Sequence, residues 1–113
     1  MTKESIIECA DRLRPNIVKA EDKNHWVDVV ENLILCHMTQ HGEFVPEISE
    51  DTLLLGDEYR DMYAYYVVAM IDLANGDIAM YNNSCSFFND MFMDWKKKWR
   101  RENVPLKDTK VVS

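Results

Sequence analysis

Two histidines four residues apart, His37 and His41, are the first candidates for chemistry in this chain. At helical spacing both imidazoles share one face, as in many zinc sites, and Cys36 adjoins them. Cys36 points about 100° away from His37, however, and no Cys-x-x-Cys or Asp-rich partner supplies the remaining ligands. Gly42 also marks the end of the helix. The pair therefore indicates a capped helix C-terminus, and we expect no metal.

Three cysteines stand on the apolar faces of segments with helical periodicity: Cys9, Cys36 and Cys85. A buried cysteine behaves as a small hydrophobe. A catalytic thiol needs an activating base and an oxyanion site, and no motif supplies either. The number of cysteines is odd and their spacing is wide, which predicts reduced thiols. The first residues also lack an apolar signal segment, so we expect an intracellular protein. We therefore expect neither an enzyme nor a bound cofactor.

Carboxylates gather between residues 47 and 61, where paired acids could bind a divalent cation or transfer protons. The segment lacks the alternating ligands and central glycine of an EF-hand. The chain also has no phosphate-binding glycine loop. A solvated acidic face explains the cluster better than a catalytic or metal site. Its members are Glu47, Glu50, Asp51, Asp57, Glu58 and Asp61.

A run of cations and tryptophans near the C-terminus is the most suggestive surface feature: Trp95, Lys96, Lys97, Lys98, Trp99, Arg100 and Arg101. Residues 1–95 carry 6 basic and 18 acidic side chains, a charge of −12, while residues 96–113 carry 7 basic and 2 acidic ones, a charge of +5. The run is consistent with three alternative roles: a solvated helix end placed favourably in the helix dipole, a docking element for an acidic partner, or a nucleic-acid contact.

The elements that must position these groups are helices, and the central one covers residues 62–74. Twelve of these thirteen residues are apolar or aromatic, and Asp72 is the one charge. The segment is too short to cross a bilayer, which takes roughly 20 apolar residues. It also lacks the polar stripe of a surface helix. We therefore expect its neighbours, or another subunit, to cover most of its sides, and Asn75-Gly76-Asp77 to end it in a tight hairpin.

The whole pattern predicts an all-α domain of four main helices over residues 1–105, with a flexible tail over residues 106–113. Apolar residues recur every three or four positions over about 2–14, 21–39 and 77–103. The irregular segment 43–56 is expected to cross one face of the bundle and to lie at an interface. The last helix would be about 40 Å long. That exceeds what a core of this size covers, so we expect Trp95 and Trp99 to meet another protein.

The last helix contains an unexpectedly polar stretch, Tyr81-Asn82-Asn83-Ser84. One interpretation places it on an outer helical face, with Asn83 hydrogen-bonded to nearby backbone. The other places it in polar packing between subunits. The sequence favours neither.

The stretch from Leu53 to Pro105 resembles the head-tail adaptor (head-tail connector, or head-completion) proteins of phages and prophages of Gram-positive bacteria. The N-terminal part of the chain matches loosely, and Gly56 stands near a position where the family has proline. No motif in the resemblance is catalytic. The motifs that carry it are Asp57-x-Tyr59-x-x-Met62-Tyr63, Ile71-Asp72-x-x-Asn75-Gly76-Asp77 and Tyr81-Asn82-Asn83-Ser84.

The resemblance implies a structural virion protein, made in the host cytoplasm and placed in the virion neck. Such adaptors form a ring, usually dodecameric, beneath the portal, where they extend the DNA channel and link capsid to tail. The implied partners are the portal protein, neighbouring copies, the next neck or tail-completion protein, and double-stranded DNA that passes without specific binding. No membrane is implied.

Three sets of residues carry these expectations. Residues 95–101 are expected to dock on the portal. We expect the contact between subunits to involve Phe44, Val45, Leu53, Leu54, Asn82 and Asn83. Acidic side chains lining the lumen would keep DNA phosphates from being held, and our candidates are Glu47, Glu50 and Asp51. The alternative is a small helical regulator or nucleic-acid-binding module that uses the basic cluster 96–101.

Overall fold

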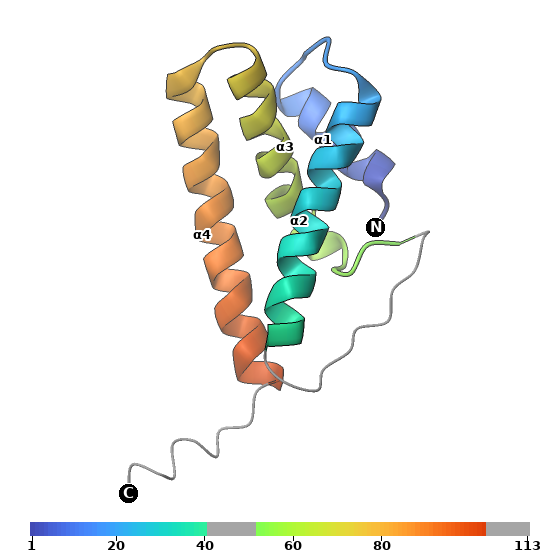
Figure 1. The fold of residues 1–113 in the computed structure, drawn as a ribbon, viewed down its shortest axis with the longest axis vertical. Coiled ribbons are helices and arrows are strands. Elements are labelled where there is room, and N and C mark those ends of the chain that lie inside the picture. Colours follow the sequence, from blue (N-terminus) through green and yellow to red (C-terminus); the bar gives the residue numbers. More distant parts are fainter. Residues whose placement is uncertain (41–51, 104–113) are drawn as a thin grey trace, which may run out of the picture.

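The structure is a computed structural model that describes residues 1–40 and 52–103. The described residues form four α-helices and one short 3-10 turn and contain no strand, which confirms the all-α prediction. In Figure 1, α3 and α4 lie antiparallel, while α2 runs alongside them and α1 packs behind. The elements are α1 (Lys3–Leu13), α2 (Ala20–Gln40), η1 (Asp57–Tyr59), α3 (Arg60–Ala74) and α4 (Ile78–Asn103).

Helix α3 is the centre of the core, as its nearly continuous apolar sequence predicts. It contacts α1, α2 and α4. Because neighbours cover so many of its sides, α3 has no broad solvent-facing stripe. Its buried residues are Met62, Tyr63, Ala64, Val67, Val68, Ala69, Ile71 and Asp72.

The turn between α3 and α4 is the predicted hairpin. Gly76 has φ +75°, a left-handed conformation that glycine adopts without a Cβ clash. Its N–H donates to the carbonyl of Leu73 (3.0 Å), and the Asp77 N–H donates to the carbonyl of Asp72 (3.0 Å), which together form a Schellman motif. The Asp77 carboxylate then accepts from the Met80 N–H at 3.1 Å and caps α4.

A second set of hydrogen bonds fixes the chain where it leads into α3. The Glu31 carboxylate on α2 accepts from the backbone N–H of Leu54 at 3.0 Å and from the hydroxyl of Tyr63. Burial, together with the hydrogen bond to Glu31, raises the pKa of Tyr63 far above its usual range. Leu55 is buried, whereas Leu53 and Leu54 are half-buried against the same core. The predicted subunit-contact residues Leu53 and Leu54 therefore keep part of their surface exposed.

No helix within residues 1–40 and 52–103 is both long enough and apolar enough to span a membrane. For α4, the longest helix, the reason is its density of polar and charged residues.

Candidate functional site

Trp95 and Trp99 do not project from the fold, so the expectation that the core leaves this end of the last helix uncovered is wrong. They are 3% and 7% exposed. Each indole packs edge-on against the imidazole of His37 near the end of α2, with ring centroids 5.4 Å apart in both cases. The length of α4 suggested an uncovered end, but α2 extends to Gln40 and covers it. Because an indole buries a large apolar area, this packing prevents either tryptophan from projecting into a partner.

The cations of the same helix end remain largely at the surface. Lys97, Arg100 and Arg101 are exposed, and none of them forms an ion pair with another described residue. Lys96 is half-buried, and its ammonium lies 4.9 Å from the centre of the Phe92 ring. Lys98 forms an ion pair with Glu102 at 3.9 Å. Of the predicted docking cluster, Lys97, Arg100 and Arg101 therefore stay available.

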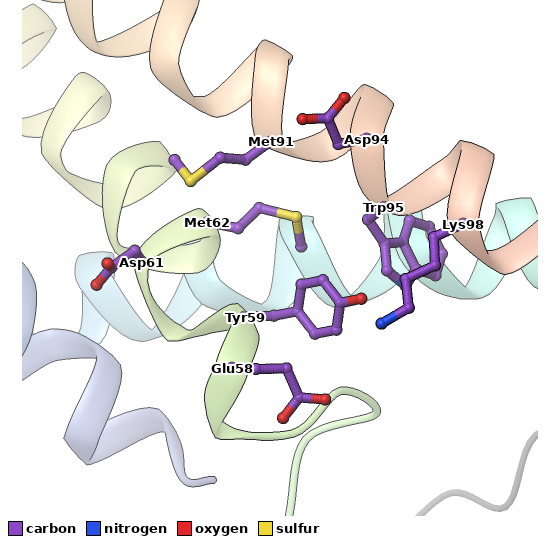
Figure 2. A pocket seen from close by; sticks show the side chains of 8 residues that line it. All are labelled: Glu58, Tyr59, Asp61, Met62, Met91, Asp94, Trp95 and Lys98. Carbon is purple, nitrogen blue, oxygen red and sulfur yellow. The ribbon is translucent and has the colours of Figure 1, made fainter.

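A pocket of about 270 Å³ opens between the start of α3 and α4. Figure 2 shows the methionine side chains of Met62 and Met91 projecting between the two helices, with Trp95 and Tyr59 beside them. Two carboxylates and one ammonium lie around this apolar floor, so the rim is net acidic. The carboxylate of Asp61, also in the lining, turns toward the Cys9 thiol on α1 at 3.9 Å. The charged lining residues are Glu58, Asp61, Asp94 and Lys98.

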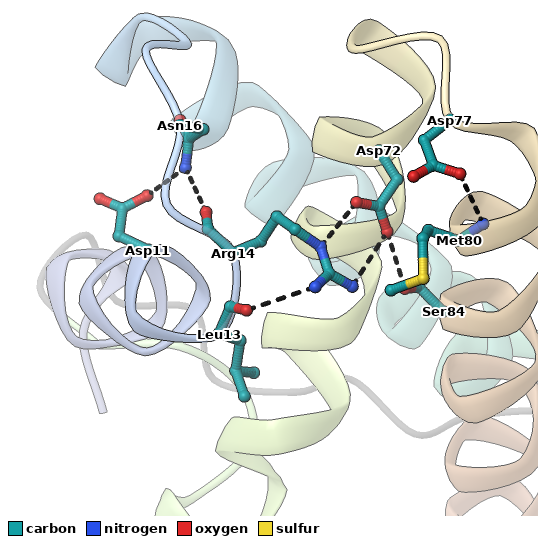
Figure 3. A network of polar contacts seen from close by, with 8 residues as sticks. All are labelled: Asp11, Leu13, Arg14, Asn16, Asp72, Asp77, Met80 and Ser84. Carbon is teal, nitrogen blue, oxygen red and sulfur yellow. Dashed lines mark hydrogen bonds and ion pairs between the residues drawn. The ribbon is translucent and has the colours of Figure 1, made fainter.

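A buried polar network connects three helices at the opposite end of the bundle (Figure 3). The Asp72 carboxylate accepts from the Arg14 guanidinium at 2.7 and 3.4 Å and from the Ser84 hydroxyl at 2.9 Å. Asp72 and Ser84 are 2% and 1% exposed, and Arg14 comes from the chain just after α1. The network fixes α1, α3 and α4 relative to one another, because a buried carboxylate is tolerated when it is paired and hydrogen-bonded.

The sequence pattern does not indicate that Arg14 and Ser84 bind Asp72. The available signal was Asp72 itself, the one charge within an apolar helix, which requires a compensating cation wherever it is buried. Ser84 is likewise buried inside the chain, neither on an outer helical face nor between subunits, whereas its neighbour Cys85 is half-buried.

The candidate metal and thiol residues of the sequence were compared with the described structure. No group of three or more His, Cys, Asp and Glu side chains within residues 1–40 and 52–103 could hold a metal ion. Burial and the nearby Asp61 carboxylate raise the pKa of the Cys9 thiol, which disfavours the reactive thiolate. His41, the second histidine of the candidate metal pair, lies outside the described residues.

The remaining predicted contact residues divide into two groups. Asn82 and Asn83 are exposed on α4, which fits both interpretations of the polar stretch, and their contact between subunits stays a prediction. The others lie outside the described residues: Phe44, Val45, Glu47, Glu50 and Asp51.

Comparison of the chain with protein-family models, with curated proteins and with solved structures found no match.

Proposed function

We propose that this chain is a head-tail adaptor, a structural virion protein whose copies form a ring under the portal, extend the DNA channel and link capsid to tail. The observation that carries the proposal is the uneven distribution of charge, with a basic end on an otherwise acidic helical domain. Exposed cations at one end of α4 are present on a chain with a net charge of −7. Together with the motifs that resemble the adaptor family, this division favours an assembly protein with charged docking faces.

Two kinds of contact follow from this role. A ring of identical copies needs a heterologous interface, in which different patches of one chain meet and the rotation closes. Contact with the portal needs a second surface, for which Lys96 and Arg101 are our candidates. The acidic residues 47–51 are proposed to face the lumen, where they would not retain DNA phosphates.

Capture by the portal protein encoded in the same genome tests the proposal. Full-length chain would be mixed with assembled portal, separated by size and imaged by electron microscopy. We expect the chain to co-elute with portal and to add a ring of density on one side. A wild-type chain that never co-elutes with portal or adds that density would contradict the adaptor role.

Charge-reversal variants locate the portal contact while keeping both buried tryptophans, which truncation before residue 95 would remove. The pair Lys96→Glu and Arg101→Glu is expected to lose portal capture. The matched control is Arg12→Glu with Lys19→Glu, which changes the charge equally at exposed positions far along the chain. Equal capture by both variants would move the portal contact away from the basic end.

The second candidate function, a nucleic-acid-binding module, is favoured by three exposed cations that form no ion pair with another described residue: Lys97, Arg100 and Arg101. It is weakened by the burial of Trp95 and Trp99, whose rings are then unable to stack on bases. DNA binding that falls steeply with salt would support this function. No binding at low salt would exclude it.

A further inference from the structure

The pocket between α3 and α4 has the composition of a receptor for an apolar side chain flanked by cations. Its floor is formed by the side chains of Met62, Met91 and Trp95. Its rim carries the carboxylates of Glu58 and Asp94, both exposed, against the single ammonium of Lys98. An apolar floor would take an apolar group, and a net negative rim would attract positive charge.

The outer face of α4 carries a matching element on the same chain. Met93, Lys97 and Arg100 follow one another at spacings of four and three residues, so they lie along one stripe of the helix. Met93 is 46% exposed, so its apolar side chain is accessible to another chain. We call these three residues the outer stripe.

The outer stripe and the pocket lie on different sides of α4. Successive residues turn by roughly 100°, which places the outer stripe away from Trp95 and Met91, the residues that α4 contributes to the pocket floor. One copy is therefore able to present its outer stripe to a second copy while its own pocket stays open for a third.

We propose that the pocket of one copy receives the outer stripe of the next copy. Met93 inserts against the methionine and tryptophan floor, and Lys97 and Arg100 pair with Glu58 and Asp94 at the rim. Such a contact is heterologous, so repetition produces a ring when the rotation closes and a filament when it does not. The inference rests on the proposed adaptor function and deepens it by assigning a neighbouring copy, not the portal, as the partner of the outer stripe.

The test is self-association of the full-length chain, measured by sedimentation up to millimolar protein at low and high salt. We expect association at about 0.01 M salt that weakens strongly at about 1 M, where the Debye length falls from roughly 30 Å to roughly 3 Å. The stripe variant, Lys97→Glu with Arg100→Glu, should weaken association at least about tenfold because like charges then meet. The rim variant, Glu58→Lys with Asp94→Lys, should do the same.

Mixing the two variants is the decisive step. Each variant alone brings like charges together, whereas the mixture pairs a basic rim with an acidic stripe and an acidic rim with a basic stripe. Association restored in the mixture would support the contact. Wild-type chain that stays monomeric throughout, or variants that associate like wild type, would overturn it.

Matched controls separate this contact from general charge and from folding. Glu4→Lys with Glu8→Lys reverses two exposed charges on α1 and should leave association unchanged. Met93→Ser should weaken association, while Leu73→Ser, at a side chain of similar exposure (40%), should not. Portal capture is scored separately. A chain that binds portal but fails these tests would retain the adaptor function and lose the proposed contact between copies.

Discussion

Replacing Asp72 by asparagine tests whether the buried network between α1, α3 and α4 holds the bundle together. Asparagine keeps the size of the side chain and one acceptor oxygen, but it removes the negative charge. The Arg14 guanidinium, whose side chain is 30% exposed, then loses its compensating carboxylate. The Ser84 hydroxyl, buried beside it, loses a charged acceptor at 2.9 Å.

The expected cost is about 2–3 kcal/mol of unfolding free energy. Breaking a fully buried ion pair costs about 3–5 kcal/mol, and a hydrogen bond to a charged group contributes about 1.5–3 kcal/mol. The expected cost lies below that of a fully buried ion pair because water still reaches part of Arg14. A domain of this size is stable by about 5–15 kcal/mol, so the loss is a large fraction of the total.

Urea unfolding followed by tryptophan fluorescence measures this loss. With an m-value of about 2 kcal/mol/M, the midpoint should fall by about 1 M. Asp77→Asn is the matched control, because the same substitution at an exposed helix cap changes stability by no more than about 0.5 kcal/mol. Equal midpoints for the Asp72 and Asp77 variants would refute the reasoning.

Three further predictions concern stability. Because the folded state raises the pKa of Tyr63, the native chain keeps a proton that the unfolded chain releases near pH 10. The unfolding free energy should therefore fall above about pH 10, by up to about 1.4 kcal/mol per pH unit, and Tyr63→Phe should make that fall shallower in urea titrations at pH 9–11. Gly76→Ala should cost about 1–2 kcal/mol because of its positive φ, whereas Gly56→Ala, with φ −83°, should cost less in the same assay. Trp99→Ala should cost about 3–5 kcal/mol by thermal or urea unfolding, whereas Arg100→Ala should be nearly neutral; an equally stable Trp99 variant would contradict its burial.

The predictable part of the fold came from local patterns. The segment 62–74 is apolar at nearly every position, which indicates a central helix whatever its neighbours are. Gly76 followed by Asp77 predicts a turn and a new helix because glycine and N-cap preferences are properties of a few adjacent residues. The helix bounds expected at 21–39 and 77–103 agree closely with α2 and α4 for the same reason.

The candidate site was less predictable because it depends on where separate helices meet. The exposure of Trp95 and Trp99 is decided by α2, whose final turns place His37 against both rings. Met62 and Met91 line the same pocket, but nothing in the sequence around either residue indicates that the two lie close together. Helical spacing already places Lys97 and Arg100 on one face with Met93, but only the packing of α4 leaves that face exposed.

The sequence by itself therefore determined the helices, the hairpin and the charge division, because backbone preferences and periodicity act over one or two turns. The tertiary structure alone decided which side chains those helices hide and which they combine. Asp72 became a tolerable buried charge because Arg14 and Ser84 reach it from other elements, 58 and 12 residues away along the chain. Such pairings depend on packing geometry between distant segments, which no local pattern contains.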